Sequence, residues 1–320
     1  MPSEFELIGR YFARDAGSGS AALGIGDDAA LVAATPEHEL VMTTDTLVCG
    51  THFFPDVEPT TLGHKTLAVN LSDLAAMGAR PRWVLLAITL PDVDEAWLAQ
   101  FASGFFELAL KHDVVLIGGD TTRGPLSITV TAIGEVAQGR ALRRDGACVG
   151  DGIWVSGQLG SAALALRHRR GEFRLRGQDL KVCCAQLDMP TPRVELGQAL
   201  VGLASSAIDV SDGLIADAGH IARASGLGME VRYGELPAIS SVLRLKHDPQ
   251  VRDALLCGGD DYELLFTVPA DAAERLDGMS ASLGLALTRI GQVVPGAGVA
   301  VIDGANGTID VDIGGYDHFA

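Results

Sequence analysis

The amino-acid sequence predicts a protein of two domains, each built from helices and strands (α/β, or α+β). The chain has 320 residues, more than one domain usually holds, and 48% of them are hydrophobic, which suffices for sizeable cores. Along the first half, short runs rich in β-branched residues alternate with segments of helical periodicity. Gly, Arg and Asp cluster at 139–152, so we divide the chain into 1–145 and 146–320.

The first domain is expected to hold two helices and four strands. One helix, 62–77, places its apolar residues on one face and stops at Gly78. The other helix, 94–112, buries a stripe formed by Trp97, Phe101, Phe105 and Leu108. The strands are expected at 40–44, 83–90, 114–117 and 126–136.

The second domain is expected to open with a strand at 153–156. Further along, Asp212-Gly213 begins a helix that ends near Gly226. Between them, segment 167–181 holds six of the 24 basic residues, and we interpret it as a solvent-exposed helix and loop.

The composition excludes several classes of protein. The net charge is −17, which argues against a general binder of nucleic acid or of anionic membranes, because phosphate surfaces need basic partners. The chain has five cysteines, with no C-x-x-C pair, and neither a signal peptide nor a membrane span is visible. We therefore expect a soluble, cytoplasmic protein.

Several of the 27 aspartates directly follow an apolar run or a glycine pair. Taken singly, each is explained by a helix cap or a turn, and the periodicity of its helix predicts that Asp73 lies on the surface. Their recurrence in both halves instead indicates a ligand site, because α/β proteins bind ligands at strand ends. Glycine lets backbone N–H groups approach phosphate, and carboxylates bind Mg²⁺. The segments are 24–28, 40–46, 114–122, 207–213 and 255–262.

The usual phosphate-binding motifs are absent. There is no G-x-x-x-x-G-K-[ST] loop, no Rossmann glycine fingerprint and no protein-kinase signature, and the chain has only four lysines. If the protein handles nucleotide phosphates, metal ions must therefore neutralise the charge that lysines neutralise elsewhere.

These residues resemble the thiamine-monophosphate kinase family, within the superfamily of ATP enzymes related to aminoimidazole ribonucleotide synthetase. The resemblance spans residues 24 to 319. The glycine-aspartate motifs are shared across the superfamily, whereas Thr-His-Phe at 51–53 and the terminal Tyr-Asp-His-Phe point to the thiamine branch. The motifs are GIGDD at 24–28, TTDT at 43–46, NLSDLAAMG at 70–78, IGGDTTRG at 117–124, IDVSDGL at 208–214, GGDDYEL at 258–264 and GYDHF at 315–319.

The resemblance implies the two-domain fold of that superfamily. Its N-terminal domain would bind ATP and Mg²⁺ and join its sheet to that of a second copy in a dimer barrel. A C-terminal α+β domain would complete an active site between the domains. The reaction implied is phosphoryl transfer from ATP to thiamine phosphate, the last step of thiamine diphosphate biosynthesis.

Site residues carry over position by position. Several Mg²⁺ ions would be bound by Asp28, Thr43, Thr44, Asp45, Asp73, Asp120, Asp209 and Asp212, of which Asp45, Asp73 and Asp120 are the central, catalytic ligands. The nucleotide would contact Gly119, Asp120, Arg144 and Ser211. Thiamine phosphate would contact His52, Asp260 and Tyr316. At neutral pH a phosphate monoester is mostly a dianion, so its oxygen can attack ATP without a protein base.

Two positions depart from the family pattern: Asp260 replaces a frequent Glu, and Ala102-Ser103 replaces an aromatic residue that some members place against ATP. Plainer roles remain open for His52, as a packing residue, for Tyr316, as a closing hydrophobic contact, and for Arg144, as a surface partner of Asp145 or Asp151. Two rival functions are another ATP enzyme of the superfamily, acting on an amide or similar oxygen, and a non-catalytic cation-binding module.

Overall fold

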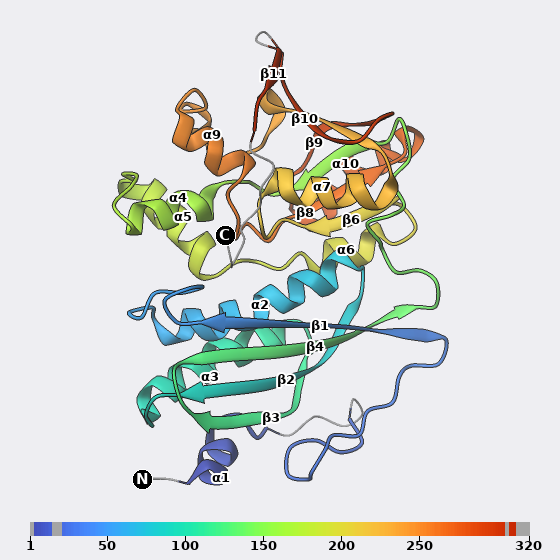
Figure 1. The fold of residues 1–320 in the computed structure, drawn as a ribbon. Helices are drawn as coiled ribbons and strands as arrows, with labels where there is room; N and C mark the ends of the chain where they lie inside the picture. The colour runs from blue at the N-terminus through green and yellow to red at the C-terminus, as the bar shows by residue number, and fades with distance from the viewer. Residues whose placement is uncertain (1–2, 15–20, 305–306, 312–320) are drawn as a thin grey trace. The chain divides into compact units, whose positions relative to one another are not determined.

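The structure, a computed structural model, describes residues 3–14, 21–304 and 307–311 (Figure 1). The chain forms two compact units, and both mix helices with sheets as predicted. Unit 1 comprises Met1–Leu74 and Ala79–Gly139, and unit 2 comprises Ala75–Gly78 and Arg140–Ala320.

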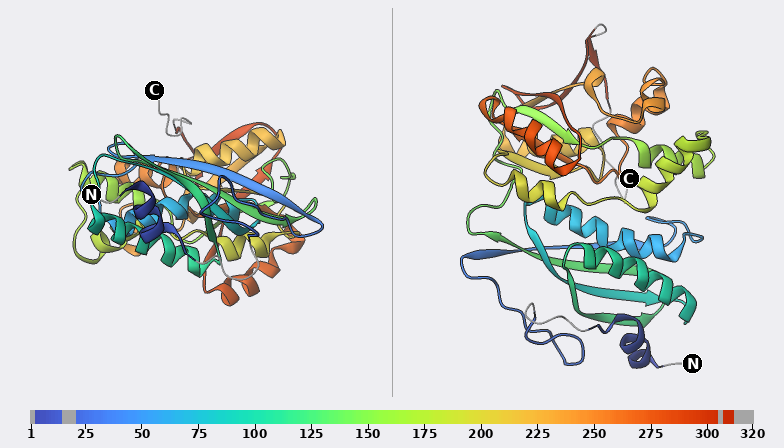
Figure 2. Two further views of the ribbon diagram at one scale, coloured as in Figure 1. Left: turned by 90° about the horizontal axis from the view of Figure 1, so that it is seen from below. Right: turned by 180° about the vertical axis from the view of Figure 1, so that it is seen from behind.

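Unit 1 is a four-stranded sheet in the order β1-β4-β2-β3. β4 pairs antiparallel with both β1 and β2, and β3 runs parallel to β2 at one edge of the sheet. Helices α2 and α3 cover one face of this sheet (Figures 1 and 2). The elements are α1 (Glu4–Leu7), the π-helical turn η1 (Ile8–Phe12), β1 (His38–Val48), α2 (Pro59–Ala76), β2 (Arg80–Leu90), α3 (Glu95–Lys111), β3 (Val115–Arg123) and β4 (Ser127–Ala137).

Helices α2 and α3 pack closely because each has a glycine at their contact. A Cβ on Gly63 would lie 2.0 Å from the carbonyl oxygen of Phe101, and one on Gly104 would lie 1.9 Å from that of Thr60. The carboxylate of Asp94 caps α3. Trp97, expected in the buried stripe, is only half-buried. It lies in the first turn of α3 and stacks on Phe101 with ring centroids 5.2 Å apart.

The other face of the unit 1 sheet carries a smaller cluster around Trp83, Ile117 and Ile133, covered in part by Ala30 and Val32 of the N-terminal segment. On β1 the same face exposes apolar side chains. Leu40 is 38% exposed, Met42 61% and Val48 37%.

Unit 2 is a seven-stranded sheet in the order β11-β10-β7-β9-β5-β8-β6, with one large hydrophobic core. Its strands are β5 (Gly152–Ser156), β6 (Ser206–Asp209), β7 (Gly228–Arg232), β8 (Leu264–Val268), β9 (Leu287–Val294), β10 (Gly298–Asp303) and β11 (Gly307–Ile309). Its helices are α4 (Ser161–Arg169), α5 (Gly177–Asp188), α6 (Val194–Leu200), α7 (Leu214–Ser225), α8 (Ser240–Leu243), α9 (Pro249–Leu256) and α10 (Glu274–Leu283), with 3₁₀ turns η2 (Tyr233–Glu235) and η3 (Ala270–Ala272).

Three strands of unit 1 are longer than predicted, and β2 differs least, since it begins at Arg80 where 83 was expected. β1 continues through Thr43–Thr46 to Val48, and β3 continues through Gly118-Gly119 to Arg123. β1 extends because its threonines pair with those of β4, and β3 extends because a bulge beside β2 accommodates the glycine pair. The motif residues of β1 and β3 therefore lie within strands, and not at strand ends as the sequence suggested.

Candidate active site

A carboxylate and a hydroxyl meet between β1 and α2 in unit 1. The hydroxyl of Thr43 donates a hydrogen bond to Asp73 Oδ2 at 2.5 Å. Two residues along the strand, the backbone N–H of Asp45 donates to Asn70 Oδ1 at 3.1 Å. Thr43 and Asp45 therefore point toward the same helix, since side chains alternate along a strand. The structure brings together three of the predicted metal ligands, Thr43, Asp45 and Asp73.

The predicted surface position of Asp73 is wrong, because the side chain is half-buried against β1. The periodicity failed because α2 is buried on nearly every side: Asn70 is 0% exposed and Ser72 is 1% exposed. Sequence reasoning also passed over Asn70, which holds the backbone of Asp45. A polar residue three positions before Asp73, inside an apolar helix, was the available signal.

Thr44 lies on the opposite face of the same strand. Its hydroxyl donates to the carbonyl of Val130 at 3.1 Å and lies 3.0 Å from the hydroxyl of Thr131. Thr44 therefore does not join the group formed by Thr43, Asp45 and Asp73.

Asp120 also stands apart from Asp45 in this unit. The pairing register places Gly119 in the row of Asp45 and Leu86, and Asp120 in the next row, that of Thr46. Three strand spacings, about 14 Å, separate β1 from β3. Because Mg²⁺ ligands lie about 2.1 Å from the ion, Asp45 and Asp120 of one chain cannot ligate the same ion.

The backbone conformation and the close packing at position 119 require glycine. Its φ is +150°, and a Cβ at this position would lie 1.8 Å from the carbonyl oxygen of Leu86. Glycine therefore lets β3 approach β2. Asp120, the next residue, is exposed.

The remaining predicted residues of unit 1 lie in loops. Asp28 is exposed, and its N–H donates to the carboxylate of Asp27 at 2.8 Å. His52 is half-buried in the turn after β1, where its Nδ1 accepts a hydrogen bond from the N–H of Val48 at 3.0 Å. That bond directs the proton of a neutral imidazole to Nε2.

In unit 2, the connection from β6 to α7 collects three predicted residues. Asp209 ends β6 and is 4% exposed, and Ser211 and Asp212 follow it, half-buried, before the helix begins at Leu214. Gly213, with φ +112°, permits a close approach, because a Cβ there would lie 2.7 Å from the carbonyl of Cys257. Here a predicted acidic residue does stand at a strand end.

Asp217, which sequence reasoning missed, holds this connection from within α7. Its Oδ2 accepts hydrogen bonds from the N–H groups of Ser211 and Asp212, both at 3.1 Å. Burial, with the charge of Asp212 beside it, raises the pKa of Asp217 to about 7, against the two N–H groups and Arg144, which lower it. An acidic residue in the first turn of a helix was the available signal.

Arg144 is exposed, and its charge acts on two neighbours: it opposes the rise in the pKa of Asp217, and it adds to burial, the main cause, in lowering the pKa of His220. The surface pairing considered for Arg144 is not observed. Arg143 binds Asp145 instead, with Nε–Oδ1 at 2.9 Å, and Asp151 accepts from the hydroxyl of Ser205 at 2.5 Å.

Asp260 lies against the connection from β6 to α7. Its N–H donates to the carbonyl of Ser211 at 2.9 Å, and one of its carboxylate oxygens accepts from the hydroxyl of Tyr262 at 3.0 Å. Both Asp260 and Tyr262 have left-handed backbones, with φ of 66° and 50°. Unit 2 thus brings Ser211, Asp212 and Asp260 together. Tyr316 lies outside the described residues.

The donor set suits a hard cation. The group in unit 1 (Thr43, Asp45 and Asp73) and the group in unit 2 (Ser211, Asp212 and Asp260) both consist of residues with carboxylate or hydroxyl oxygens. Oxygen atoms are the ligands that Mg²⁺ prefers. Within residues 3–14, 21–304 and 307–311, no cluster of three or more His, Cys, Asp or Glu side chains forms a ready-made metal site. A Mg²⁺ ion at these carboxylates would therefore take further ligands from phosphate oxygens or water, as it usually does.

Comparison with known proteins assigns the chain to a family. The model of the AIR synthase related protein matches in two parts, its N-terminal domain over residues 26–136 and its C-terminal domain over 149–304. The thiamine-monophosphate kinase of Salmonella typhimurium is 47% identical over 324 residues, covering 99% of this chain and 98% of that protein. This chain belongs to the thiamine-monophosphate kinase family. The predicted resemblance is confirmed.

Solved structures of the family share the fold. The thiamine-monophosphate kinase of Stenotrophomonas maltophilia superposes with a TM-score of 0.87 at 50% identity, covering 93% of this chain and 96% of that one. A complex of AaThiL with AMPPCP and TMP superposes with a TM-score of 0.78 at 31% identity, covering 92% of each chain. No helix within the described part of this family member is long and apolar enough to cross a membrane.

Proposed function

We propose that this chain transfers the γ-phosphoryl group of ATP to thiamine phosphate, giving thiamine diphosphate and ADP. The observation that carries the proposal is the similarity, over nearly the whole chain, to kinases named for this substrate. A relative that holds AMPPCP, an ATP analogue, together with TMP supports a ternary complex of the two substrates. The bond between Asp260 and Ser211 agrees with this, since it joins a residue proposed for thiamine phosphate to one proposed for ATP.

The proposed chemistry asks for positioning and charge neutralisation, with no general base. The acceptor is already a dianion near neutral pH, so the protein must align it with the γ-phosphorus and offset the repulsion between two phosphate groups. Bound Mg²⁺ would supply that neutralisation and stabilise the charge of the loose transition state.

The Mg²⁺ ions would be held by the predicted ligands of both units, some grouped and some apart in the structure. In unit 1, Asp73 is fixed by the Thr43 hydroxyl, and Asp45 by Asn70. Asp209 and Asp212 of unit 2, with Asp28, Thr44 and Asp120, complete the proposed set. Because Asp45 and Asp120 of one chain cannot share an ion, Asp120 would bind a Mg²⁺ ion other than the one at Asp45 of its own chain.

The substrates would bind to residues beside these groups. Gly119 and Ser211 would present backbone groups to the nucleotide phosphates, with Asp120 and Arg144 adjacent. Asp260, His52 and Tyr316 would hold thiamine phosphate, whose thiazolium ring is cationic and complements the Asp260 carboxylate.

We also propose that the protein is a cytoplasmic homodimer. The apolar side chains of Leu40, Met42 and Val48 on the open face of β1 would be covered when two such sheets join. ATP as a substrate, together with five free cysteines, fits a reducing compartment.

A product assay with a panel of acceptors tests the function. Purified protein, ATP and Mg²⁺ are incubated with thiamine phosphate, with thiamine, or with a nucleoside monophosphate, and products are separated by chromatography. We expect product only with thiamine phosphate as the acceptor, in the form of thiamine diphosphate. No thiamine diphosphate should form after chelation of Mg²⁺. Turnover of ATP with another acceptor in the panel, or cation binding with no turnover, would overturn the proposal.

A further inference from the structure

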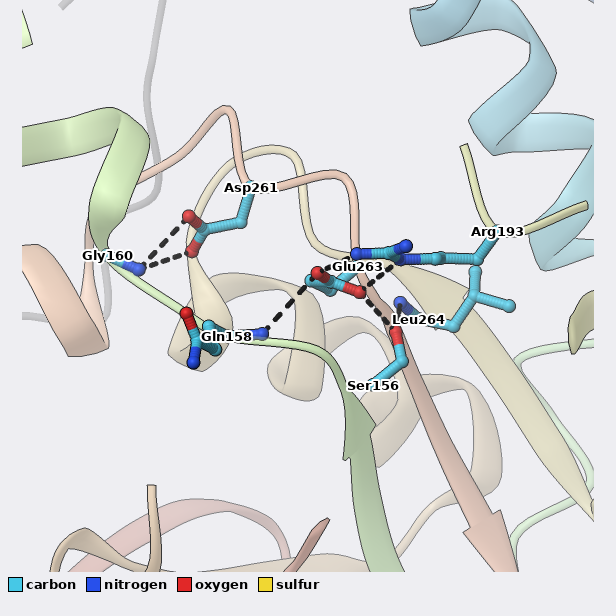
Figure 3. Close-up of polar contacts among 7 residues, drawn as sticks. All are labelled: Ser156, Gln158, Gly160, Arg193, Asp261, Glu263 and Leu264. Atoms are coloured by element: carbon cyan, nitrogen blue, oxygen red, sulfur yellow. Dashed lines mark hydrogen bonds and ion pairs between the residues drawn. The ribbon is translucent and has the colours of Figure 1, made fainter. Parts of the chain in front are cut away.

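The residues around Asp260 alternate between two environments. Asp261 and Glu263 are buried, at 8% and 2% exposure, whereas Asp260 and Tyr262 between them are half-buried. Figure 3 shows the two buried carboxylates extending toward different partners. The half-buried pair carries the left-handed backbone, which non-glycine residues adopt only where their surroundings impose it.

Glu263 is the more strongly bound of the two buried acids. Arg193 forms a bidentate ion pair with Glu263: its Nε donates to Oε2 at 2.6 Å and its Nη2 donates to Oε1 at 2.5 Å. The hydroxyl of Ser156 donates to Oε2 at 2.5 Å and accepts from the N–H of Leu264 at 2.9 Å (Figure 3). This one side chain therefore ties the start of β8 to the end of β5 and to the residue before α6.

The space for Glu263 is made by a glycine. Gly157 has a φ of +56°, and a Cβ there would lie 1.9 Å from Glu263 Oε1. Asp261 anchors the other side: its two carboxylate oxygens accept from the N–H of Gly160 at 3.0 and 2.8 Å, at the start of α4 (Figure 3).

The backbone of this segment is paired with the β6–α7 connection. The N–H of Tyr262 donates to the carbonyl of Val210, and the N–H of Val210 donates to the carbonyl of Glu263, both at 2.8 Å. Ser211 and Asp212 are held separately, by Asp217. Because the Asp217 bonds do not depend on Glu263, loosening Glu263 should displace Asp260, three residues away in the same segment, more than Ser211 and Asp212, even though Asp260 and Ser211 share a backbone bond.

We propose that the Arg193–Glu263 pair and Asp261 are positioning residues that hold Asp260 in place for the acceptor substrate. The inference rests on the proposed function, in which Asp260 binds thiamine phosphate. It assigns a role to three residues outside the proposed substrate contacts, and it explains why the left-handed backbone persists at Asp260: the bonds on both sides of the segment over-determine it.

The test separates the Michaelis constants of the two substrates. Glu263→Gln removes the charge and cannot accept both Arg193 bonds, so we expect KM for thiamine phosphate to rise about tenfold or more, with KM for ATP changed less than about twofold. Arg193→Lys, a milder change that keeps the charge, should give a smaller rise in the same constant. The Arg193→Lys variant still tests the proposal if the Glu263→Gln protein folds poorly.

The matched control is Glu135→Gln. Glu135 is also buried, at 5% exposure, and binds an arginine, Arg82, at 2.9 Å, but it lies in β4, away from the proposed residues. It should lower the melting temperature while leaving both KM values near wild type. Equal rises in both KM values, or no rise in either, in a folded Glu263→Gln protein would overturn the positioning role. Failure of the wild-type protein to use thiamine phosphate would instead overturn the proposed function, so the two failures are distinguishable.

Discussion

The backbone N–H of Asp260 donates a hydrogen bond to the carbonyl oxygen of Ser211 at 2.9 Å. These residues come from different motifs, 49 positions apart in the sequence, and under the proposed function they contact different substrates. A phosphoryl-transfer enzyme must hold donor and acceptor in fixed relation, because small displacements cost large factors in rate. A direct backbone bond between the two binding segments provides such a relation.

The Thr43 hydroxyl is expected to matter through Asp73. Thr43→Val keeps the shape of the side chain but removes the donor that orients the carboxylate. We expect kcat/KM to fall about tenfold or more and the Mg²⁺ concentration for half-maximal rate to rise, since partners that orient metal ligands have effects of this size. Steady-state kinetics against Mg²⁺ measures both. Thr46→Val, on the opposite face of β1, is the control and should change the rate less than about twofold.

Gly119 is expected to tolerate no side chain. Gly119→Ala would place a Cβ against the Leu86 carbonyl at a φ of +150°, so we expect the free energy of unfolding to fall by about 3 kcal/mol or more. Gly139→Ala is the control: φ is +69°, nothing lies within 4 Å of its Cβ, and the loss should be about 1 kcal/mol. Chemical denaturation measures both variants. Equal losses would contradict the steric argument.

Asp217 is expected to make stability depend on pH. Its pKa is raised from 3.8 to about 7 in the folded protein, chiefly by burial, so the folded state retains a proton that the unfolded state has released. Stability should therefore fall as pH rises from about 4 to about 7, by up to about 1.4 kcal/mol per pH unit. Asp217→Asn lacks this proton and should show a flatter profile in urea unfolding without divalent cations. Identical slopes would contradict the assignment.

The thiol of Cys183 is expected to be inert. Burial raises its pKa to about 11, whereas Cys148 is exposed. At pH 8 an alkylating reagent should therefore modify Cys183 about 100-fold more slowly than Cys148, because the thiolate is the reactive form. Peptide mapping after timed alkylation measures the ratio. Comparable rates in the folded protein would show that Cys183 is accessible.

The sequence was sufficient for the fold class and for helices α2 and α3 of unit 1, because their periodicity and caps are local features. It failed where tertiary contacts decide. β1 runs past Thr44 because of threonines on β4, more than 80 residues away, and Asp73 is half-buried because β1 lies against its helix.

In the candidate site too, local features could be predicted from the sequence and long-range contacts could not. The motifs could be located from their glycines and aspartates, but nothing local identifies Arg193 as the partner of Glu263, 70 positions away. Nor could the spacing show that Asp45 and Asp120 lie in different rows of one sheet. Register and long-range ion pairs are settled by packing, which the sequence carries only indirectly.

The central claim is direct phosphoryl transfer, and labelled ATP tests it most directly. Purified protein is mixed with γ-³²P-labelled ATP, thiamine phosphate and Mg²⁺, and the label is followed through products and protein. We predict that the label appears in thiamine diphosphate, that one ADP forms for each labelled product, and that the protein carries none. Label released as inorganic phosphate, retained on the protein, or absent from thiamine diphosphate would contradict the account.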